Sequence, residues 1–482
     1  MADTLDGTEF ETRSEADWRG LAEQALGGAP FESLVSETDD GIAYGPIHAR
    51  VSPAVPILRS EPATPWRIVQ RVDDPDPVRA NLQALADLEG GANALALVFE
   101  GAPSAGGFGL PLTKRAILSA LDGVMLEMVH VRIEPHPDLD TAVMLLRQAV
   151  VARRGVGFDR LSVDQAIDPI GCFAATGRFP GRDDQSLRYR LEDLLKPWFD
   201  EGLGGTLVEA DGRVYHEAGA SEAQELGAVL STALYYLRAF SGSGHDLHAL
   251  ILPIAFTLVA DQKQFLATAK VRALRLLWSR LLAECEVNDA RHAIRIHVET
   301  SRRMMTAKDP HTNIVRTTIA AFAAATGGAD SLSVLPFTAA NGLPEAKARR
   351  LARNVQAILQ DESGLSRVAD PAAGSGGIEA LTEAIAEAAW DEFRRIEAEG
   401  GIAESLQKGA LQARIGATRA ARQARFDDRS EAAIGVTHYP METEREIAVL
   451  VPAAEGAATI ADGSDCEPLR PRRLTETREH AA

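Results

Sequence analysis

Short extended runs alternate with helical stretches along most of this chain, and this alternation constrains the fold more than any other feature. Runs with the apolar character of buried strands recur about every 30–45 residues, with helical spacing between them. Strands that are separated by helices lie parallel in one sheet. Eight such units predict a (β/α)8 TIM barrel of class α/β. The expected strands are residues 94–99, 126–134, 161–167, 205–210, the first half of 247–259, 294–300, 331–337 and 366–371.

An open, doubly wound sheet is the alternative that the same alternation allows. That fold needs a glycine-rich, phosphate-binding turn that leads straight into a helix when it binds a dinucleotide. The segment 101–109 is glycine-rich and follows an expected strand. Because it leads to Pro111 and not directly into a helix, the sequence disfavours a dinucleotide site there.

The expected barrel occupies residues 65–400, and segments of different composition flank it. Residues 1–64 are proline-rich and loosely patterned, which is typical of an extended N-terminal arm that wraps another surface, such as a partner. Residues 401–450 form a C-terminal helical extension, with a helix expected over 402–425 that packs on the barrel. Residues 451–482 are poor in apolar side chains and predict a flexible tail.

Charge and cysteine usage exclude several classes of protein. The formal net charge of −19 argues against a nucleic-acid binder or a polybasic membrane anchor. No apolar run is long enough to span a membrane, and the acidic N-terminus lacks the apolar core of a secretory signal. Cys172, Cys285 and Cys466 are widely spaced and form neither a disulfide framework nor a zinc-ligand pattern. This usage favours a reducing cytoplasm and no metal site.

One group of polar residues follows the fourth expected strand, where barrel enzymes place ligand-binding side chains. It contains Arg213, Tyr215, His216 and Glu217. A tyrosine, a histidine and a glutamate side by side can supply a proton donor, a base and an orienting carboxylate. The competing interpretation, which we favour on the residues alone, is that His216 and Glu217 cap the next helix or pair locally.

A second group lies on and after the sixth expected strand. His297 and Glu299 alternate along the strand and so share one face, where a satisfied structural pair is the favoured interpretation. Arg302 and Arg303 lie on the loop that follows and are the better phosphate-binding candidates among the arginines. The histidines and aspartate of 245–248 run directly into an expected core strand, so a metal or cobalamin role is disfavoured.

Several segments of the chain form a recognisable series: PWRIVQ at 65–70, EAGA at 217–220, KVRALRLLW at 270–278, TS at 300–301 followed by DPHTNIVRTT at 309–318, LARNVQAILQDESG at 351–364 and DPAAGS at 370–375. In this order they resemble the methylmalonyl-CoA mutase family. The resemblance implies a TIM barrel that takes up acyl-CoA, with the pantetheine threading the barrel and a C-terminal cobalamin domain over its mouth. Homolysis of adenosylcobalamin would then start a radical carbon-skeleton rearrangement.

The sequence departs from the catalytic pattern of this family in three ways. Arg213 and Val214 stand where catalytic chains carry a Tyr-His pair, and Val214 can neither titrate nor donate a hydrogen bond. Residues 51–65 contain no tyrosine, whereas catalytic chains carry a substrate-facing one there. The Asp-x-His-x-x-Gly signature of the cobalamin domain is missing, and the sequence after Val451 is short and polar.

These departures resemble the family's small, or β, subunit, and GRVYHEAGA at 212–220 is similar to the small-subunit version. The resemblance implies a heterodimeric mutase that interconverts methylmalonyl-CoA and succinyl-CoA in propionate metabolism. In it, a large, or α, subunit holds adenosylcobalamin, and the acyl-CoA is handled by the complex. This chain would bind no cofactor directly, contribute no catalytic residue and be inactive alone.

Two other functions remain open at this point. A catalytic acyl-CoA mutase subunit that works with a separate cobalamin-binding chain would use Tyr215, His216 and Glu217. A scaffold or interaction protein would use only the barrel surface. Tight acyl-CoA binding by the isolated barrel distinguishes the first of these from the small-subunit interpretation, and unchanged partner activity without this chain identifies the second.

Overall fold

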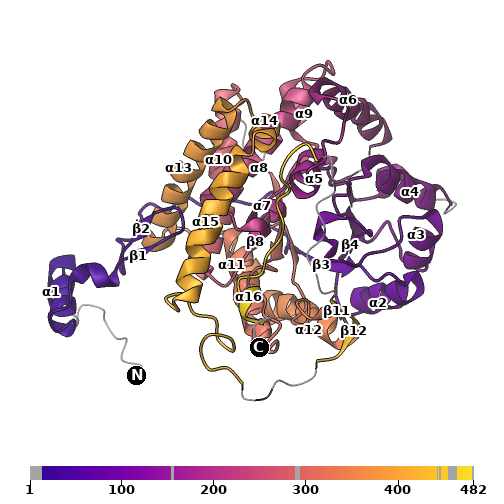
Figure 1. The fold of residues 1–482 in the computed structure, drawn as a ribbon. Helices are drawn as coiled ribbons and strands as arrows, with labels where there is room; N and C mark the ends of the chain where they lie inside the picture. Colours follow the sequence, from indigo (N-terminus) through magenta and orange to yellow (C-terminus); the bar gives the residue numbers. More distant parts are fainter. Residues whose placement is uncertain are drawn as a thin grey trace, which may run out of the picture.

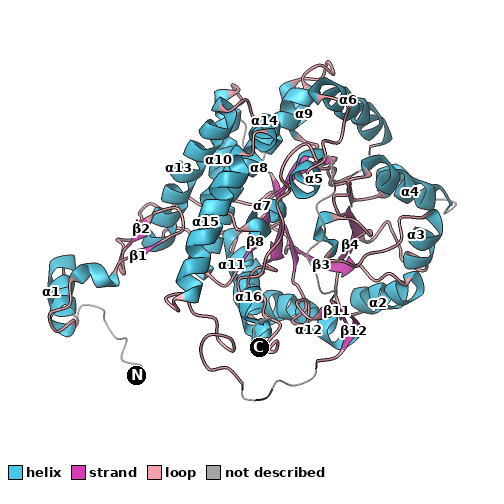
Figure 2. Cartoon of the chain, viewed as in Figure 1, coloured by secondary structure: helices cyan, strands magenta, loops and turns pink. Residues whose placement is uncertain are grey.

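The computed structural model describes residues 13–152, 157–202, 204–287, 294–441, 443, 447–453 and 464–479. A barrel of parallel strands lies at its centre, helices surround the barrel, and one arm projects from this body (Figures 1 and 2). In these ranges no helix has both the length and the apolar character that a membrane crossing requires.

Eight parallel strands form the barrel in the order β6-β5-β4-β3-β10-β9-β8-β7. Backbone hydrogen bonds close the seam between the two end strands: Val163 donates to the Gly204 carbonyl at 2.6 Å and Gln165 to the Thr206 carbonyl at 2.9 Å. The predicted barrel is therefore confirmed. Its strands are β3 (Arg67–Val72), β4 (Ala94–Leu97), β5 (His130–Ile133), β6 (Val163–Asp164), β7 (Val208–Asp211), β8 (Ile254–Ala260), β9 (Arg295–Thr300) and β10 (Ser331–Ser333).

One of the eight predicted strands is wrong. Residues 366–371 contain the end of the short 3₁₀ helix η7 (Leu365–Arg367) and a turn, and β3 takes the missing place in the barrel. Arg71 interrupts the apolar run of β3, so the pattern of residues 67–72 does not indicate a buried strand. Arg71 is buried and ion-paired inside the barrel, so the strand is polar without being exposed.

A second predicted strand is displaced. The first half of residues 247–259 forms the short helix α9 (Leu247–Ile251), and β8 is the second half. Asp246 caps α9 by accepting a hydrogen bond from the Ala249 amide at 2.8 Å. Asp246 therefore serves the backbone here.

Helices cover the outside of the barrel (Figure 2). A helix predicted over 402–425 is two helices, α14 (Ile402–Gln407) and α15 (Ala410–Asp427), because Gly409 has a φ of +71° and ends the first. The outer helices are α2 (Pro77–Glu89), α3 (Lys114–Ala120), α4 (Leu139–Ala152), α5 (Pro169–Thr176), α6 (Asp184–Glu201), α8 (Glu222–Phe240), α10 (Gln264–Glu284), α11 (Thr312–Gly327), α12 (Ala346–Ala357) and α13 (Gly376–Ala398).

The described part of the N-terminal arm starts with α1 (Glu15–Ala25), which lies away from the barrel and has no buried residue (Figure 1). A short antiparallel pair, β1 (Ser36–Glu37) and β2 (Ala43–Tyr44), follows. Between these strands Asp39 forms ion pairs with Arg422 and Arg425 of α15. Asp39 therefore fastens the base of the arm to the body.

The end of the chain returns to the barrel. Residues 464–479, here called the C-terminal strap, lie against α5, α7 (Arg213–Ala218) and the loop after β9. The strap amides of Leu469, Arg472 and Leu474 donate to three backbone carbonyls of the body at 2.8, 2.9 and 3.2 Å. Low apolar content predicted a flexible tail for residues 451–482, whereas the strap is held by its backbone amides and by side chains such as Asp465 and Glu479, which accept hydrogen bonds from the Phe179 and Ala307 amides, both at 2.8 Å. Residues 454–463 and 480–482 lie outside the described ranges.

Candidate functional site

The barrel lumen holds a layer of charged side chains centred on Arg132 of β5. Its guanidinium donates to Glu134 at 2.9 Å, to Glu209 of β7 at 2.6 Å and to Thr257 of β8 at 3.0 Å. The side chains of Arg132, Glu134 and Glu209 are at most 2% exposed. These groups satisfy one another, as buried charges must.

A second layer lies toward the carboxyl ends of the strands, and Arg213 is its centre. Residues 213–218 form α7 directly after β7, and this turn of helix directs Arg213 into the lumen. Its guanidinium binds Asp211 at 2.8 Å, Glu134 at 2.5 Å and Glu299 of β9 at 3.6 Å. Arg213 thus joins carboxylates from three places around the barrel.

Arg71 extends this network across β3. It donates to Glu299 at 2.8 Å and to Asp73 at 3.2 Å. Burial alone raises the pKa of Glu134, but Arg213, Arg132 and Arg71 outweigh it and hold that pKa well below the usual range. The carboxylate is therefore charged, and buried ion pairs occupy this part of the lumen.

His216 of α7 lies outside this network in a separate buried cluster. Its Nδ1 is 3.1 Å from Glu225 of α8, and its Nε2 is 2.9 Å from the Ser301 hydroxyl after β9. Lys270 of α10 donates to the same Glu225 at 2.6 Å. Burial, followed by the charges of Arg303 and Lys270, lowers the pKa of His216 well below its usual value, so the imidazole is neutral.

This cluster has the order serine, histidine and acid, but it has no room for a substrate. Ser301 and Glu225 are fully buried, and His216 is 1% exposed. Both ring nitrogens of His216 already have partners. The hydrogen bonds of this cluster therefore link α7, α8, α10 and the loop after β9.

The neighbours of His216 in α7 are also engaged or enclosed. Tyr215 is 1% exposed, and burial raises the pKa of its hydroxyl above the ordinary value. Glu217 accepts a hydrogen bond from the Arg302 amide at 2.9 Å, and its pKa is raised to about 7, chiefly by burial. The structure does not bring Tyr215, His216 and Glu217 together around one substrate position, because the three side chains contact different parts of the molecule.

The other predicted residues are also placed within the body. His297 and Glu299 do not pair: His297 Nδ1 lies 2.8 Å from the Ser331 hydroxyl, whereas Glu299 binds Arg71 and Arg213. Burial and the charge of Arg132 lower the pKa of His297 well below its usual value. The shared face predicted for the two residues thus serves two different contacts.

The two arginines after β9 differ in their surroundings. Arg303 donates to the carbonyls of His216 and Ala220, both at 2.9 Å, and so holds α7 in place. The Arg302 guanidinium lies against Gly106, where a β-carbon would overlap it. Gly106 also has a φ of +62°, which explains one glycine of the segment 101–109 without a nucleotide.

Arg132, Glu134 and Glu209 of the lumen were not predicted from the sequence, although a signal for them exists. In β5 and after it, His130, Arg132 and Glu134 alternate, and in β7 Glu209 and Asp211 do so. Alternate residues of a strand share one face. Charged residues with that period in otherwise apolar strands indicate a polar lumen.

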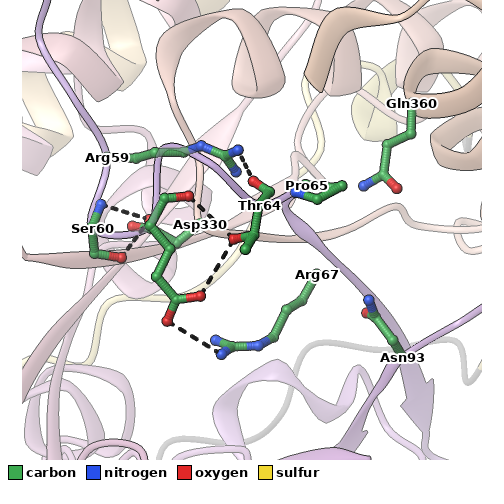
Figure 3. Close-up of a pocket in the computed structure, with 9 residues that line it drawn as sticks. Arg59, Ser60, Thr64, Pro65, Arg67, Asn93, Asp330 and Gln360 are labelled. Atoms are coloured by element: carbon green, nitrogen blue, oxygen red, sulfur yellow. Dashed lines mark hydrogen bonds and ion pairs between the residues drawn. The ribbon is translucent and has the colours of Figure 1, made fainter. Parts of the chain in front are cut away.

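A cavity of about 250 Å³ lies at the opposite, amino-terminal end of β3 and β10 (Figure 3). Its polar groups are engaged: Ser60 binds Asp330 at 2.7 Å, and Gln360 donates to the Trp66 carbonyl at 2.7 Å. Barrel enzymes place catalysis at the other end. Across the described ranges, no group of histidine, cysteine and acidic side chains is arranged to hold a metal ion.

Comparison with known proteins identifies the family. A family model described as methylmalonyl-CoA mutase matches residues 112–471. The methylmalonyl-CoA mutase small subunit of Streptomyces virginiae is 37% identical over 91% of this chain and 72% of its own length. That of Propionibacterium freudenreichii subsp. shermanii is 32% identical over 96% of this chain and 75% of its own length.

More distant similarity extends to a large subunit. The methylmalonyl-CoA mutase large subunit of S. virginiae is 27% identical over 97% of this chain and 67% of its own length. Among solved structures, a dihydropteroate synthase from Xanthomonas albilineans covers 62% of this chain at 13% identity and a TM-score of 0.30, which supports no argument. The family model and the two small subunits each cover most of this chain, and the chain belongs to the methylmalonyl-CoA mutase family.

Proposed function

We propose that this chain is the non-catalytic small subunit of a heterodimeric methylmalonyl-CoA mutase, whose large subunit carries the active site. The observation that carries this proposal is the filled lumen. Arg213, Asp211 and Glu134 occupy the space through which a catalytic barrel of this family would thread acyl-CoA. Similarity to two small subunits supports the same assignment. In the complex, methylmalonyl-CoA and succinyl-CoA are interconverted, and this chain contributes stability.

The chemistry of α7 supports an inactive barrel. Carboxylates hold Arg213, so its guanidinium is not free to bind a thioester carbonyl. Val214 has no polar group that could bind the carbonyl in place of that guanidinium. His216 is neutral, buried and engaged at both ring nitrogens, so it is not available for proton transfer to a substrate.

The mouth of this barrel does not fit adenosylcobalamin. The C-terminal strap lies over α7 and the loop after β9, where Arg472 and Leu474 bind the backbone carbonyls of Glu217 and Arg303. We therefore assign the cofactor to the large subunit, where it supplies the radical chemistry of the rearrangement. No residue of this chain takes part in that step.

The partner of this chain is the large subunit, and the N-terminal arm is the segment that would wrap it. Every described residue of α1 is at least partly exposed, and Leu21 is 61% exposed. An apolar side chain on a projecting helix is suited to burial against another chain. Cys172, Cys285 and Cys466 are free thiols, which supports a reducing cytoplasm for the complex.

Binding of acyl-CoA tests this function. We expect the isolated chain to show no calorimetric binding of methylmalonyl-CoA at concentrations up to about 1 mM. The complex with the large subunit is expected to bind one equivalent, measured without adenosylcobalamin so that no turnover occurs. Circular dichroism of the isolated chain provides the control for folding.

Tight binding by the isolated, folded chain would overturn the proposal. It would show that the lumen opens, and it would favour a catalytic chain that borrows cobalamin from another protein. In that case Tyr215, His216 and Glu217 would become the residues to substitute first.

A further inference from the structure

The C-terminal strap presents arginines to two different surfaces. Arg473 turns toward the loop after β9, where it pairs with Glu479 at 2.5 Å and lies 3.4 Å from the Met305 carbonyl. Arg470 and Arg472 instead line a cavity against α15. Pro468 and Pro471 flank Arg470 and favour extended backbone, in which alternate residues share a side. The strap therefore delivers two arginines to one place.

A third arginine reaches the same cavity from α15. Arg419 lies beside α7, where a β-carbon on Gly219 would be 2.6 Å from the Arg419 β-carbon. One of its terminal nitrogens donates to the Ala218 carbonyl at 3.3 Å. Burial lowers the pKa of Arg419, and the nearby charge of Arg472 lowers it further. The site thus brings cations close together.

Arg419 and Arg470 are partly buried and Arg472 is exposed, and within the described ranges none of the three forms an ion pair like those of the fully buried arginines. Arg132 and Arg213 are each bound by at least two carboxylates. Among the residues that the structure describes, no carboxylate lies within ion-pair distance of Arg419, Arg470 or Arg472, and the Arg470 Nε is buried without a hydrogen-bond partner. In a chain with a net charge of −19, these three arginines beside the single Glu467 give a local excess of positive charge.

The cavity between them has room for a small anion. Its volume is about 70 Å³, enough for several water molecules or one compact oxyanion. Gly416 of α15 lines it, and a β-carbon there would meet nothing within 4 Å. Glycine in the middle of a helix costs about 1 kcal/mol relative to alanine. Alanine would therefore fit at this position without closing the cavity.

The charges that line the cavity match one chemical class. Arg419, Arg470 and Arg472 contribute three positive charges and Glu467 one negative charge, which leaves a net charge of +2. A phosphate group carries about −1.5 to −2 near neutral pH and offers oxygens that pair with guanidinium forks. We propose that this cavity, between α15 and the C-terminal strap, binds a phosphate group, either as the free ion or as a small phosphate monoester.

This site is separate from the barrel lumen and does not depend on the proposed subunit role. Because the cavity holds only the phosphate itself, any ester group must extend into solvent. A phosphate bound there would bridge α15 and the strap, which pass beside α7. Binding is therefore expected to fasten the strap to the body.

Calorimetry with inorganic phosphate and with glycerol 3-phosphate, in low-salt buffer on the full chain, tests this proposal. Saturable binding is expected for inorganic phosphate, and similar affinity for glycerol 3-phosphate would identify an ester as an equally good source. Arg470→Gln and Arg472→Gln should each weaken binding about tenfold or more. Glu467→Gln should strengthen it, since it removes the one negative charge among the described residues that line the cavity.

Gly416 offers a matched pair of variants. Gly416→Ala leaves the cavity open and favours the helix, so phosphate binding should persist. Gly416→Glu places a carboxylate among the arginines and should abolish it, with circular dichroism confirming that both variants fold. Absence of saturable binding at about 10 mM phosphate would overturn the proposal. Binding that survives Arg470→Gln, Arg472→Gln and Gly416→Glu would also overturn it.

Discussion

Replacement of Arg132 by methionine tests the ion-paired lumen most sharply. The Arg132 side chain is 2% exposed and binds Glu134, Glu209 and Thr257. Methionine fills similar volume but leaves the buried Glu209 without its principal cation and removes one of the cations around Glu134. Removal of one partner of a buried ion pair costs about 3–5 kcal/mol. We expect the free energy of unfolding of Arg132→Met to fall by that amount.

The decrease in the free energy of unfolding of Arg132→Met should depend on pH in a defined direction. Burial raises the pKa of Glu209 even with Arg132 present, and loss of Arg132 raises it further. A carboxyl group with a raised pKa in the folded state stabilises the fold most when it is protonated. The deficit of Arg132→Met relative to the unchanged chain is therefore smallest at acidic pH and grows as pH rises through the raised pKa.

Urea denaturation followed by circular dichroism measures both effects. Arg394→Met is the matched control, since Arg394 is 66% exposed and its pair with Asp391 is expected to contribute less than about 1 kcal/mol. The double variant Arg132→Met/Glu209→Leu should recover part of the loss, because it removes the unpaired charge. A loss below about 1 kcal/mol for Arg132→Met would refute the claim that these ion pairs fill the lumen.

Further predictions concern the mouth and the arm. Burial raises the pKa of Glu217 to about 7, so its protonated form favours the folded chain below pH 4.5 and this contribution is lost as pH rises through 7. The melting temperature of the unchanged chain, relative to Glu217→Gln, should therefore fall between pH 4.5 and pH 8. Asp39→Asn removes the anchors of the arm on Arg422 and Arg425, and trypsin should then cleave the arm faster at pH 7. Equal cleavage rates with and without the substitution would show that these pairs do not hold the arm.

The barrel itself was predictable because helix and strand periods are local properties of the sequence. The strand β3 was not predictable in this way, since Arg71 makes its sequence resemble an exposed segment. Its partner Glu299 lies 228 positions away along the chain. A charged residue is acceptable in the core only with such a partner, and composition does not indicate where that partner is. The same limit applies to the strap, whose amides bind carbonyls far away in the sequence.

The candidate site was predictable in position but not in environment. Residues 213–217 lie at the carboxyl end of a barrel strand, as their place after β7 indicated. Two partners of the His216 cluster, Glu225 and Lys270, come from different helices, and nothing in their spacing indicates that they meet. Whether a histidine is a base or a buried link depends on these long-range contacts.

A mutase assay with adenosylcobalamin tests the central claim most directly. Methylmalonyl-CoA turnover would be measured for this chain alone, for the large subunit alone and for the mixture, with His216→Asn in the mixture as a variant of the candidate residue. We predict no turnover by this chain alone, turnover that is present or greatly increased in the mixture, and unchanged turnover per folded complex for the variant. Turnover by this chain with an unrelated cobalamin-binding protein, lost on substitution of His216, would contradict the account and make this barrel the catalytic one.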